Sequence, residues 1–263
     1  MERKGENKMK PTVIILSVSS DIGMYLAKRY LRNGYQIVGT YRSYGKLSEI
    51  DNLPDCRLFH CDISDKKSVK KFLKDFKKLR IHWNLFISCV GNLKPYGDFF
   101  KTDFDAWGNS VRVNSIEQLR VAHGLYPLRN KNAHPSIVFF AGGGVNNAVS
   151  HLSAYVVSKI MLIKMCELLD AENPDLKAFI IGPGYIKTKI HDLIKMDVTK
   201  GKKETKLIDV YNGIRWLTSQ DKKVVGGRNF SIAFDPLFHG NEYILVKELL
   251  EDPNMYKLRR YKG

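Results

Sequence analysis

The sequence has few cysteines, no long apolar run and no repeated or low-complexity segment. Its four cysteines among 263 residues form no Cys-x-x-Cys pair, so we expect reduced thiols. No window approaches the roughly 20 apolar residues of a membrane-spanning helix. The basic N-terminus lacks the apolar segment and cleavage site of a secretory signal. These absences predict a soluble, cytoplasmic protein without a membrane span.

Acidic residues are also scarce, because 27 Asp and Glu stand against 43 Lys and Arg, which gives a net charge of +16. Such an excess is found in many nucleic-acid-binding proteins. The densest basic run, from Lys66 to Arg80, has apolar residues at helical spacing and predicts an amphipathic helix with a lysine-rich face in water. No motif of interleaved basic and aromatic residues accompanies it. We therefore expect no nucleic-acid partner.

The apolar residues predict strands that alternate with helices. Hydrophobic residues make up 44% of the chain and charged residues 27%, which excludes a disordered, collagen-like or coiled-coil protein. Helical patterns fill most intervals between the strands, as in a parallel sheet covered on both faces. We predict an α/β fold with a doubly wound, Rossmann-type parallel sheet of about seven strands. The expected strands cover residues 12–16, 36–41, 57–61, 84–90, 136–141, 176–181 and 228–233.

No Pro/Gly-rich linker divides the chain, so residues 11–263 are predicted to form a single domain. Residues 1–10 are expected to be a flexible leader, with Met9 as an alternative start. A variable segment from about 187 to 206 is expected to face the substrate, and the tail after Phe234 is expected to be irregular.

The segment from Ser17 to Gly23 lies between the first predicted strand and the helix that follows it. Turns at this place bind the pyrophosphate of a dinucleotide through free N–H groups and the positive helix end. Only Gly23 remains of the glycines expected there, because Ser17 and Asp21 replace the others. Asp21 fits an N-cap, and its carboxylate also predicts looser phosphate binding than an all-glycine turn gives.

The end of the second predicted strand indicates which dinucleotide is bound. A carboxylate about 20 residues beyond the glycine motif would select NAD through the ribose 2′-hydroxyl. Tyr41 occupies that place, and Arg42 follows it. A guanidinium suits a 2′-phosphate, so NADP(H) is predicted, with a solvent-facing arginine as the alternative.

Tyr155 and Lys159 form an i, i+4 pair within a predicted helix, which places both side chains on one face. An ammonium near a phenol stabilises the phenolate and lowers the pKa of the phenol, as proton transfer to a carbonyl oxygen requires. Such i, i+4 pairs also arise by chance, so the surrounding sequence decides whether this pair is functional.

Three segments, Ser-Asp-Ile-Gly23, Tyr155-x-x-x-Lys159 and Gly182-Pro-Gly-Tyr-Ile-Lys-Thr188, together resemble the short-chain dehydrogenase/reductase family. The resemblance runs from about residue 12 to 233. It implies that Tyr155 is the general acid/base, and that Lys159 lowers the pKa of the tyrosine and holds the nicotinamide ribose. Asn114 resembles the family's helix asparagine, which holds a water linked to the lysine. A homodimer or homotetramer is also implied.

The resemblance further implies an NADP(H) site that extends along the carboxyl ends of the strands. Asp62 and Ile63 would contact the adenine, the Pro183 to Ile186 segment would flank the nicotinamide, and Thr188 would reach the carboxamide or the phosphates. The implied cofactor-binding residues are Ser17, Ser19, Ser20, Ile22, Gly23, Arg42, Ser43, Asp62, Ile63, Cys89, Val90, Gly91, Tyr155, Lys159, Pro183, Gly184, Ile186 and Thr188.

One position departs from the family pattern, because Gly142 stands where the family has its catalytic serine. Loss of a comparable hydrogen-bond donor costs about 10²–10³ in rate. Backbone N–H groups of the glycine run, or the side chains of Asn146, Ser150 or His151, are candidate substitutes near the substrate, with plain loop polarity as the alternative. Gly142→Ser is expected to raise activity if the missing hydroxyl limits it.

Two tail segments, Ser231 to Asp235 and Met255 to Arg260, resemble a subset of the family linked to bacterial surface-polysaccharide sugars, which implies a sugar or nucleotide-sugar substrate. The leading hypothesis is an NADP(H)-dependent carbonyl reductase or alcohol dehydrogenase that acts on a small molecule without a metal. The alternatives are an NADP-binding protein with weak or no catalysis, and a nucleotide-sugar epimerase or dehydratase. The sequence leaves the substrate and the reaction direction open.

Overall fold

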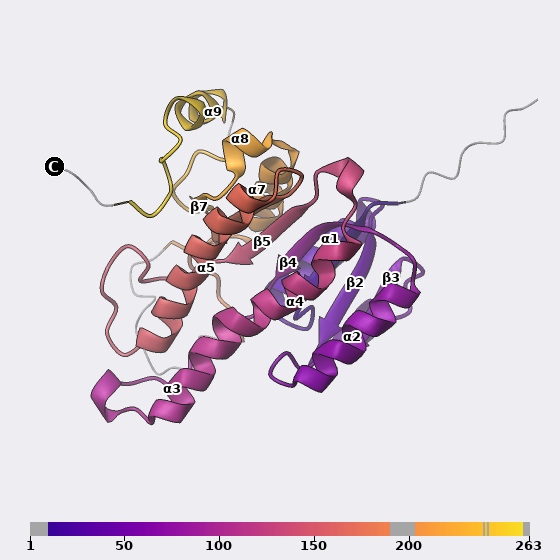
Figure 1. Cartoon of the computed structure of the whole chain (residues 1–263), viewed down its shortest axis with the longest axis horizontal. Helices are drawn as coiled ribbons and strands as arrows, with labels where there is room; N and C mark the ends of the chain where they lie inside the picture. The colour runs from indigo at the N-terminus through magenta and orange to yellow at the C-terminus, as the bar shows by residue number, and fades with distance from the viewer. Residues whose placement is uncertain (1–9, 190–202, 239, 241, 260–263) are drawn as a thin grey trace, which may run out of the picture.

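A parallel sheet of seven strands forms the centre of the computed structural model, which describes residues 10–189, 203–238, 240 and 242–259 (Figure 1). The strands are β1 (Thr12–Leu16), β2 (Gln36–Tyr41), β3 (Cys56–His60), β4 (Trp83–Ser88), β5 (Ser136–Phe140), β6 (Lys177–Gly182) and β7 (Asn229–Ser231). Their order is β3-β2-β1-β4-β5-β6-β7. The chain therefore starts mid-sheet, runs to one edge, returns and runs to the other, which confirms the predicted doubly wound fold.

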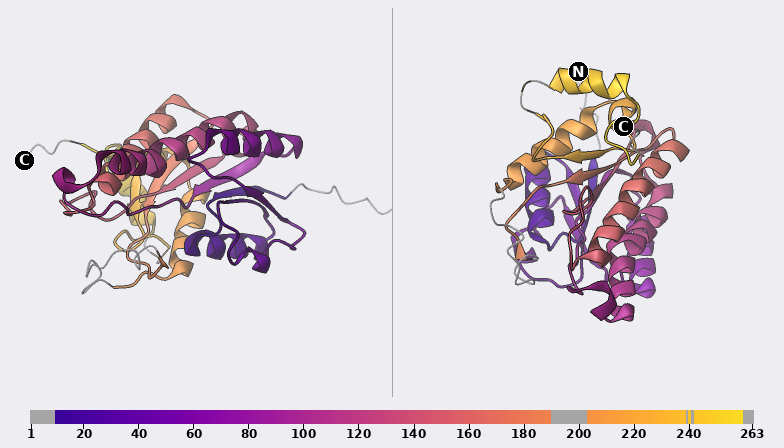
Figure 2. Two further views of the ribbon diagram at one scale, coloured as in Figure 1. Left: turned by 90° about the horizontal axis from the view of Figure 1, so that it is seen from below. Right: turned by 90° about the vertical axis from the view of Figure 1, so that its left-hand side faces the viewer.

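Helices cover both faces of the sheet (Figure 2). In the described part of the chain the α-helices are α1 (Asp21–Arg32), α2 (Lys66–Lys78), α3 (Phe104–Val111), α4 (Glu117–Leu125), α5 (Ser153–Glu172), α7 (Leu207–Ser219), α8 (Lys222–Val225) and α9 (Glu242–Glu251). One hydrophobic core lies under α1, α7, α8 and α9, and the other lies under α2, α4 and α5. A π-helical turn (Arg112–Ile116) joins α3 to α4, and short 3-10 helices cover Leu47–Glu49, Phe99–Lys101, Tyr126–Leu128 and Lys131–Ala133.

The strands are buried on both faces because their sequences are apolar without alternation. In β1, Val13 and Ile15 belong to one core, whereas Ile14 and Leu16 belong to the other. Every residue of β1 is buried. This pattern follows from the two-residue repeat of a strand, which sends successive side chains to opposite faces.

The lysine-rich segment forms α2, as predicted, with Val69, Phe72 and Phe76 buried. The tail differs from the expectation, because α9 follows Phe234 where an irregular segment was predicted. Leu245 and Leu249 explain the helix, since their i, i+4 spacing brings both side chains into the core.

Residues 1–9 of the predicted leader and 190–202 of the predicted substrate segment lie outside the described residues. The limits of the domain therefore stay a prediction. Among the helices of the described ranges, none has the length and apolar character needed to cross a membrane.

Candidate active site

A cavity of about 1370 Å³ lies at the carboxyl ends of the strands. Residues that follow each of the seven strands line it, from Ser17 after β1 to Phe234 after β7. In open α/β sheets, ligands bind at the carboxyl ends of the strands. A crevice forms there at the point where the strand order reverses.

The turn after β1 keeps the backbone geometry of a phosphate-binding turn with few glycines. Ser17 has a left-handed φ of 63°, and its N–H donates to Thr40 Oγ1 at 3.2 Å. Ser20 Oγ donates to Ser17 O at 2.9 Å and accepts from Gly23 N at 3.0 Å, so Ser20 caps α1. A Cβ on Gly23 would lie 2.6 Å from Ser17 O, which explains why this glycine remains. Gly23 lies behind the cavity wall rather than in it.

Asp21 was expected to fit an N-cap, but it is the first residue of α1, because Ser20 holds the capping position. Its Oδ2 instead accepts a hydrogen bond from Lys189 N at 3.0 Å. Asp21 thus ties the segment after β6 to the turn after β1. Within the described residues, the N–H groups of Ser19 and Ile22 have no acceptor, so they are free for an anionic ligand.

Charged side chains line the cavity beyond β2 and β3. Arg42 is exposed and, like Ser43 and Ile63, lines the cavity. Asp62 Oδ1 accepts from Ser64 N at 2.9 Å and from Ser64 Oγ at 2.7 Å. Burial opposes ionisation of Asp62, but the Ser64 hydrogen bonds, with the nearby charges of Arg42 and His60, lower the pKa of its carboxyl. A carboxylate beside a guanidinium can bind an adenosine that carries a phosphate.

Tyr155 and Lys159 lie near the start of α5 and line the same cavity. Lys159 is 1% exposed, and its Nζ donates to Val90 O at 3.3 Å. Burial lowers the pKa of Lys159 to about 8. Desolvation also raises the pKa of Tyr155 to about 12, opposite to the expected lowering, and Lys159 Nζ lies 5.4 Å from the centre of the phenol ring. The tyrosine therefore holds its proton at neutral pH.

The phenol ring of Tyr155 occupies the space that a side chain at residue 142 would need. A Cβ on Gly142 would lie 2.2 Å from Tyr155 Cε1 and 2.4 Å from its hydroxyl oxygen. A serine at Gly142 must displace the phenol, so Gly142→Ser is now expected to lower activity. A Cβ on Gly143 would meet nothing within 4 Å. In the described chain, the N–H groups of Gly142 and Gly143 donate to no acceptor, and both residues line the cavity.

Three other predicted site residues, Asn114, Ser150 and His151, are not among the residues that line the cavity. Asn114 is fully buried, and its side chain accepts from Asn92 N at 2.8 Å and donates to Asn92 O at 2.7 Å. It therefore supports the cavity through Asn92. His151 Nδ1 lies 2.8 Å from Asp98 Oδ1. The substrate candidate Asn146 does line the cavity, as do Cys89, Val90 and Gly91.

The segment after β6 forms another part of the wall. Gly184 has a φ of 78°, and a Cβ there would lie 2.2 Å from Thr205 Oγ1 and 3.0 Å from Ala233 Cβ. Pro183, Ile186 and Thr188 also line the cavity. Sequence reasoning did not name Thr205 or Ser231–Phe234 as individual site residues, although both line the cavity. Thr205 lies in the segment 187–206 that was expected to face the substrate, and Ser231–Phe234 lie at the end of the last predicted strand, in one of the two tail segments with a family resemblance.

Comparison with known proteins agrees with this geometry. The family profile described as enoyl-(acyl carrier protein) reductase matches residues 17–232. The chain belongs to the short-chain dehydrogenase/reductase family. The family comprises oxidoreductases that use nicotinamide cofactors.

The relatives are distant. The short chain dehydrogenase andI of Emericella variicolor is 22% identical over 69% of this chain and 63% of its own length. The chain spans less than two thirds of the length of this relative and of two others, from Monascus ruber and Dictyostelium discoideum.

Two solved structures share the fold. A short-chain dehydrogenase from Shigella flexneri complexed with NADP has a TM-score of 0.75 and 19% identity, over 85% of this chain and 97% of its own. A 4-hydroxyisoleucine dehydrogenase complexed with NADH and succinate has a TM-score of 0.72 and 16% identity, over 83% of this chain and 96% of its own.

The cavity of this family member fits a dinucleotide. Its volume of about 1370 Å³ exceeds the roughly 300–1,000 Å³ of most small-molecule pockets. The free N–H groups after β1 suit a pyrophosphate. Among the described residues, no cluster of three or more His, Cys, Asp or Glu could hold a metal ion.

Proposed function

We propose that the protein is an NADP(H)-dependent oxidoreductase that interconverts a small-molecule carbonyl compound and its alcohol. One observation carries the proposal: Tyr155 and Lys159 line the same continuous cavity as the free amides after β1, the Arg42 guanidinium and the Pro183–Gly184 segment. Groups that suit each part of an NADP molecule thus line the same cavity as a proton donor.

The chain's own residues would hold the cofactor at three places. Arg42 and Ser43 would bind the 2′-phosphate, and the N–H groups of Ser19 and Ile22 would bind the pyrophosphate. Lys159 and Pro183–Gly184 would hold the nicotinamide ribose and ring. When bound, the nicotinamide supplies or accepts the hydride.

Tyr155 would transfer the proton at its phenol oxygen. Its pKa of about 12 keeps the phenol protonated, as the donor for carbonyl reduction must be. A protonated Lys159 beside the phenol would stabilise the phenolate that forms on donation, which lowers the cost of the step. The free N–H groups of Gly142 and Gly143 would bind the substrate oxygen in place of the family's serine.

The test is NADPH oxidation with a panel of keto-sugars and other carbonyl compounds, followed by absorbance. Tyr155→Phe should lower kcat by about 10²–10⁴-fold, the usual contribution of a general acid. The dissociation constant of NADPH should stay nearly the same, because the phenol does not bind the phosphates. Unchanged turnover in Tyr155→Phe would remove the tyrosine from the mechanism.

A sugar or nucleotide-sugar is the substrate class that we infer from the tail segments Ser231–Asp235 and Met255–Arg260. The family resemblance supports a homo-oligomer, and the composition of the sequence supports a location in the cytoplasm. The keto-sugar panel tests the substrate class, and the mass in solution tests the homo-oligomer.

The missing serine hydroxyl at Gly142, where the Tyr155 ring fills the space of a side chain, favours a second candidate, an NADP(H)-binding protein with little turnover. Tight NADPH binding without oxidation by any carbonyl compound would support it. Retention of the cofactor with conversion of a nucleotide-sugar, and no net NADPH consumption, would instead indicate an epimerase or dehydratase.

A further inference from the structure

A series of buried polar side chains joins the end of β4 to α4. Ser88, the last residue of β4, donates from its hydroxyl to Gln118 Oε1 at 2.6 Å. Gln118 Nε2 in turn donates to the main-chain oxygen of Asn114 at 2.6 Å. The Asn114 side chain accepts from Asn92 N at 2.8 Å and donates to Asn92 O at 2.7 Å. Gln118 therefore links the strand end, through Asn114, to a residue that lines the cavity.

This network of side chains is fully buried and fully paired. Ser88, Asn114 and Gln118 are each 0% exposed. Each side-chain nitrogen and oxygen of the three residues has a hydrogen-bond partner. A buried network in which every polar group is paired fixes one arrangement, because the loss of any member leaves another polar group buried without its partner. The three side chains therefore specify the geometry of the strand end.

The helix is distorted where it meets this network. The N–H of Glu117 donates to Arg112 O, five residues earlier, which makes Arg112–Ile116 a π-helical turn. In an α-helix, the carbonyl of residue 114 accepts from the main-chain N–H of residue 118. Here that carbonyl accepts from the side chain of Gln118. Gln118 thus gives a donor to the distorted turn and an acceptor to β4 with the same carboxamide.

The contact of Lys159 lies between the two residues that the network holds. Lys159 is 1% exposed, and its Nζ donates to Val90 O at 3.3 Å. Val90 is midway between Ser88 and Asn92 in the sequence. The same ammonium lies 5.4 Å from the centre of the Tyr155 ring. Because the residues on both sides of Val90 are fixed, its carbonyl is fixed too, and with it the place of the ammonium beside the phenol.

We propose that Gln118 is a positioning residue, which fixes the end of β4 and thereby keeps the Lys159 ammonium beside the Tyr155 phenol. The inference rests on the proposed function, because that function assigns proton transfer to Tyr155 and its electrostatic support to Lys159. Gln118 is not among the residues that line the cavity, so it acts through the strand end. The adenine end of the cavity lies after β2 and β3, so it should not depend on Gln118.

The ionisation of Lys159 reports this link, whereas a loss of stability alone would not change it. Within the described chain, the titratable groups that face its ammonium are the Cys89 thiol, from the segment after β4, and the Tyr155 phenol, from α5. Burial raises the pKa of each to about 12, so both stay neutral where Lys159 titrates. An ammonium that loses its acceptor is destabilised relative to the neutral amine, so loss of the network should lower the pKa of Lys159.

The test is Gln118→Met, which keeps the length of the side chain and removes both of its hydrogen bonds. NMR of the free protein with isotope-labelled lysine ε carbons follows the titration of Lys159, and the Lys159→Met variant assigns its signal. The midpoint should fall by about one pH unit, somewhat less than a whole hydrogen bond to a charged group contributes. The pH at which kcat for carbonyl reduction declines should fall with it.

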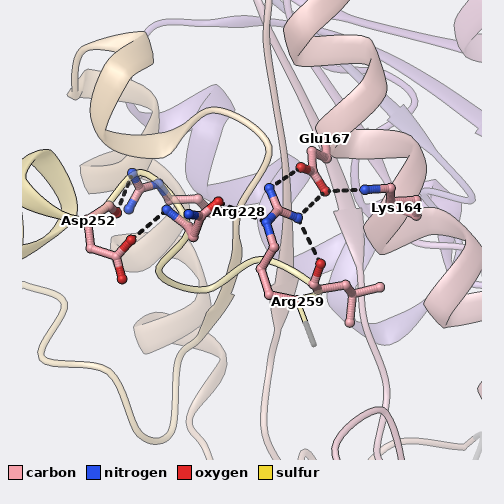
Figure 3. A network of polar contacts seen from close by, with 7 residues as sticks. Lys164, Glu167, Arg228, Asp252 and Arg259 are labelled. Carbon is pink, nitrogen blue, oxygen red and sulfur yellow. Dashed lines mark hydrogen bonds and ion pairs between the residues drawn. The ribbon is translucent and has the colours of Figure 1, made fainter. Parts of the chain in front are cut away.

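The matched control changes a second polar network of α5, away from the cavity (Figure 3). Arg259 Nη1 donates to Glu167 Oε2 at 3.1 Å, and Lys164 Nζ donates to the same oxygen at 2.8 Å. Glu167 lies on α5, roughly two helical turns beyond Lys159. Arg259→Met therefore makes the same replacement and should leave the Lys159 titration unchanged. Both variants should bind adenosine 2′,5′-bisphosphate, which carries only the adenine end of NADPH, as tightly as the wild type does.

A second pair of variants separates positioning from stability. Ser88→Ala breaks the network from the strand side and should lower the Lys159 midpoint by less than Gln118→Met does. The double variant should regain part of the stability that Gln118→Met loses in urea titrations, because the hydroxyl that lost its partner is also removed. Its midpoint should stay where Gln118→Met puts it, since both changes break one link. An unchanged midpoint in Ser88→Ala would contradict the inference even if Gln118→Met did not fold.

Three other results would each overturn the inference. If Lys159 titrates in Gln118→Met as it does in the wild type, the position of Val90 O does not depend on Gln118. If its midpoint rises, the ammonium is stabilised by water instead of by Val90 O. If Arg259→Met lowers the midpoint equally, the shift reports a looser α5. These NMR results do not require turnover. If the midpoints fall as expected but the wild type oxidises NADPH with no carbonyl compound, the link between Gln118 and Lys159 stands and the proposed function fails.

Discussion

The turn after β1 and the loop after β5 both depart from the family pattern, but with different consequences. In the turn, Ser17 takes the left-handed conformation of a glycine, and Ser20 and Gly23 complete the start of α1. Its free N–H groups survive the substitutions. In the loop, Gly142 removes a side chain, and the Tyr155 ring fills the space. A site built from backbone groups thus tolerates changes of side chain, whereas a site built from a hydroxyl does not.

The largest expected effect comes from filling the space at residue 142. Gly142→Ser must displace the Tyr155 phenol, so kcat should fall toward the roughly 10²-fold or greater loss of a missing general acid. Gly108→Ser is the control, since a Cβ at Gly108 meets nothing within 4 Å and Gly108 is not among the residues that line the cavity. The measurement is kcat for both variants under saturating NADPH. A gain of activity in Gly142→Ser would show that the loop after β5 lacks only a hydroxyl. The loop would then not differ from the turn after β1 in how it tolerates a change of side chain.

A smaller effect is expected at the adenine end. Arg42→Ala should weaken NADPH binding by about 1.5–3 kcal/mol, roughly 10- to 150-fold, because a charged hydrogen bond to the 2′-phosphate is lost. NADH, which lacks this phosphate, should bind as before. The exposed Arg57 of β3, which is not among the residues that line the cavity, provides a control through Arg57→Ala. Equal losses for both dinucleotides would contradict the phosphate assignment.

The pH dependence should separate the two ends of the cavity. Burial lowers the pKa of Lys159 to about 8, so its cation is present below pH 8 and is lost as the pH rises. The kcat for reduction should therefore fall about tenfold between pH 7 and pH 9. Adenosine 2′,5′-bisphosphate binding should not change over this range.

The same shift predicts that the free energy of unfolding rises between about pH 8 and the ordinary lysine value of 10.5, because the unfolded lysine then binds a proton that the folded one does not. The Lys159→Met variant should show neither the fall in kcat between pH 7 and pH 9 nor the rise in the free energy of unfolding above about pH 8. A pH-independent kcat in the wild type would mean that the lysine charge does not assist proton transfer.

Much of this arrangement could be predicted from sequence because it depends on local spacing. The apolar run of β1, the place of Arg42 after β2 and the i, i+4 pair Tyr155 and Lys159 each require only a few neighbouring residues. Parallel strands then bring their carboxyl ends to one edge.

The contacts that sequence could not predict join distant residues. No local pattern pairs Asp21 with Lys189, or Arg259 with Glu167. His151 was predicted to lie near the substrate, yet its Nδ1 lies 2.8 Å from Asp98 Oδ1 and it does not line the cavity. The position of the Tyr155 ring in the space beside Gly142 depends on how the side chain lies in three dimensions, which sequence spacing does not specify.

The smallest expected effect concerns the turn after β1, whose role depends on backbone N–H groups. Ser20→Ala removes the cap of α1 and the hydrogen bond to Ser17 O, so unfolding should become easier by about 1 kcal/mol in urea titrations. NADPH binding should weaken several-fold as well, because Ser17 is then less firmly held in its left-handed conformation. Ser19→Ala is the control, since within the described residues its hydroxyl has no partner. Equal stability and affinity in the two variants would mean that Ser20 does not maintain the turn, and that its geometry comes from Gly23 and Thr40 alone.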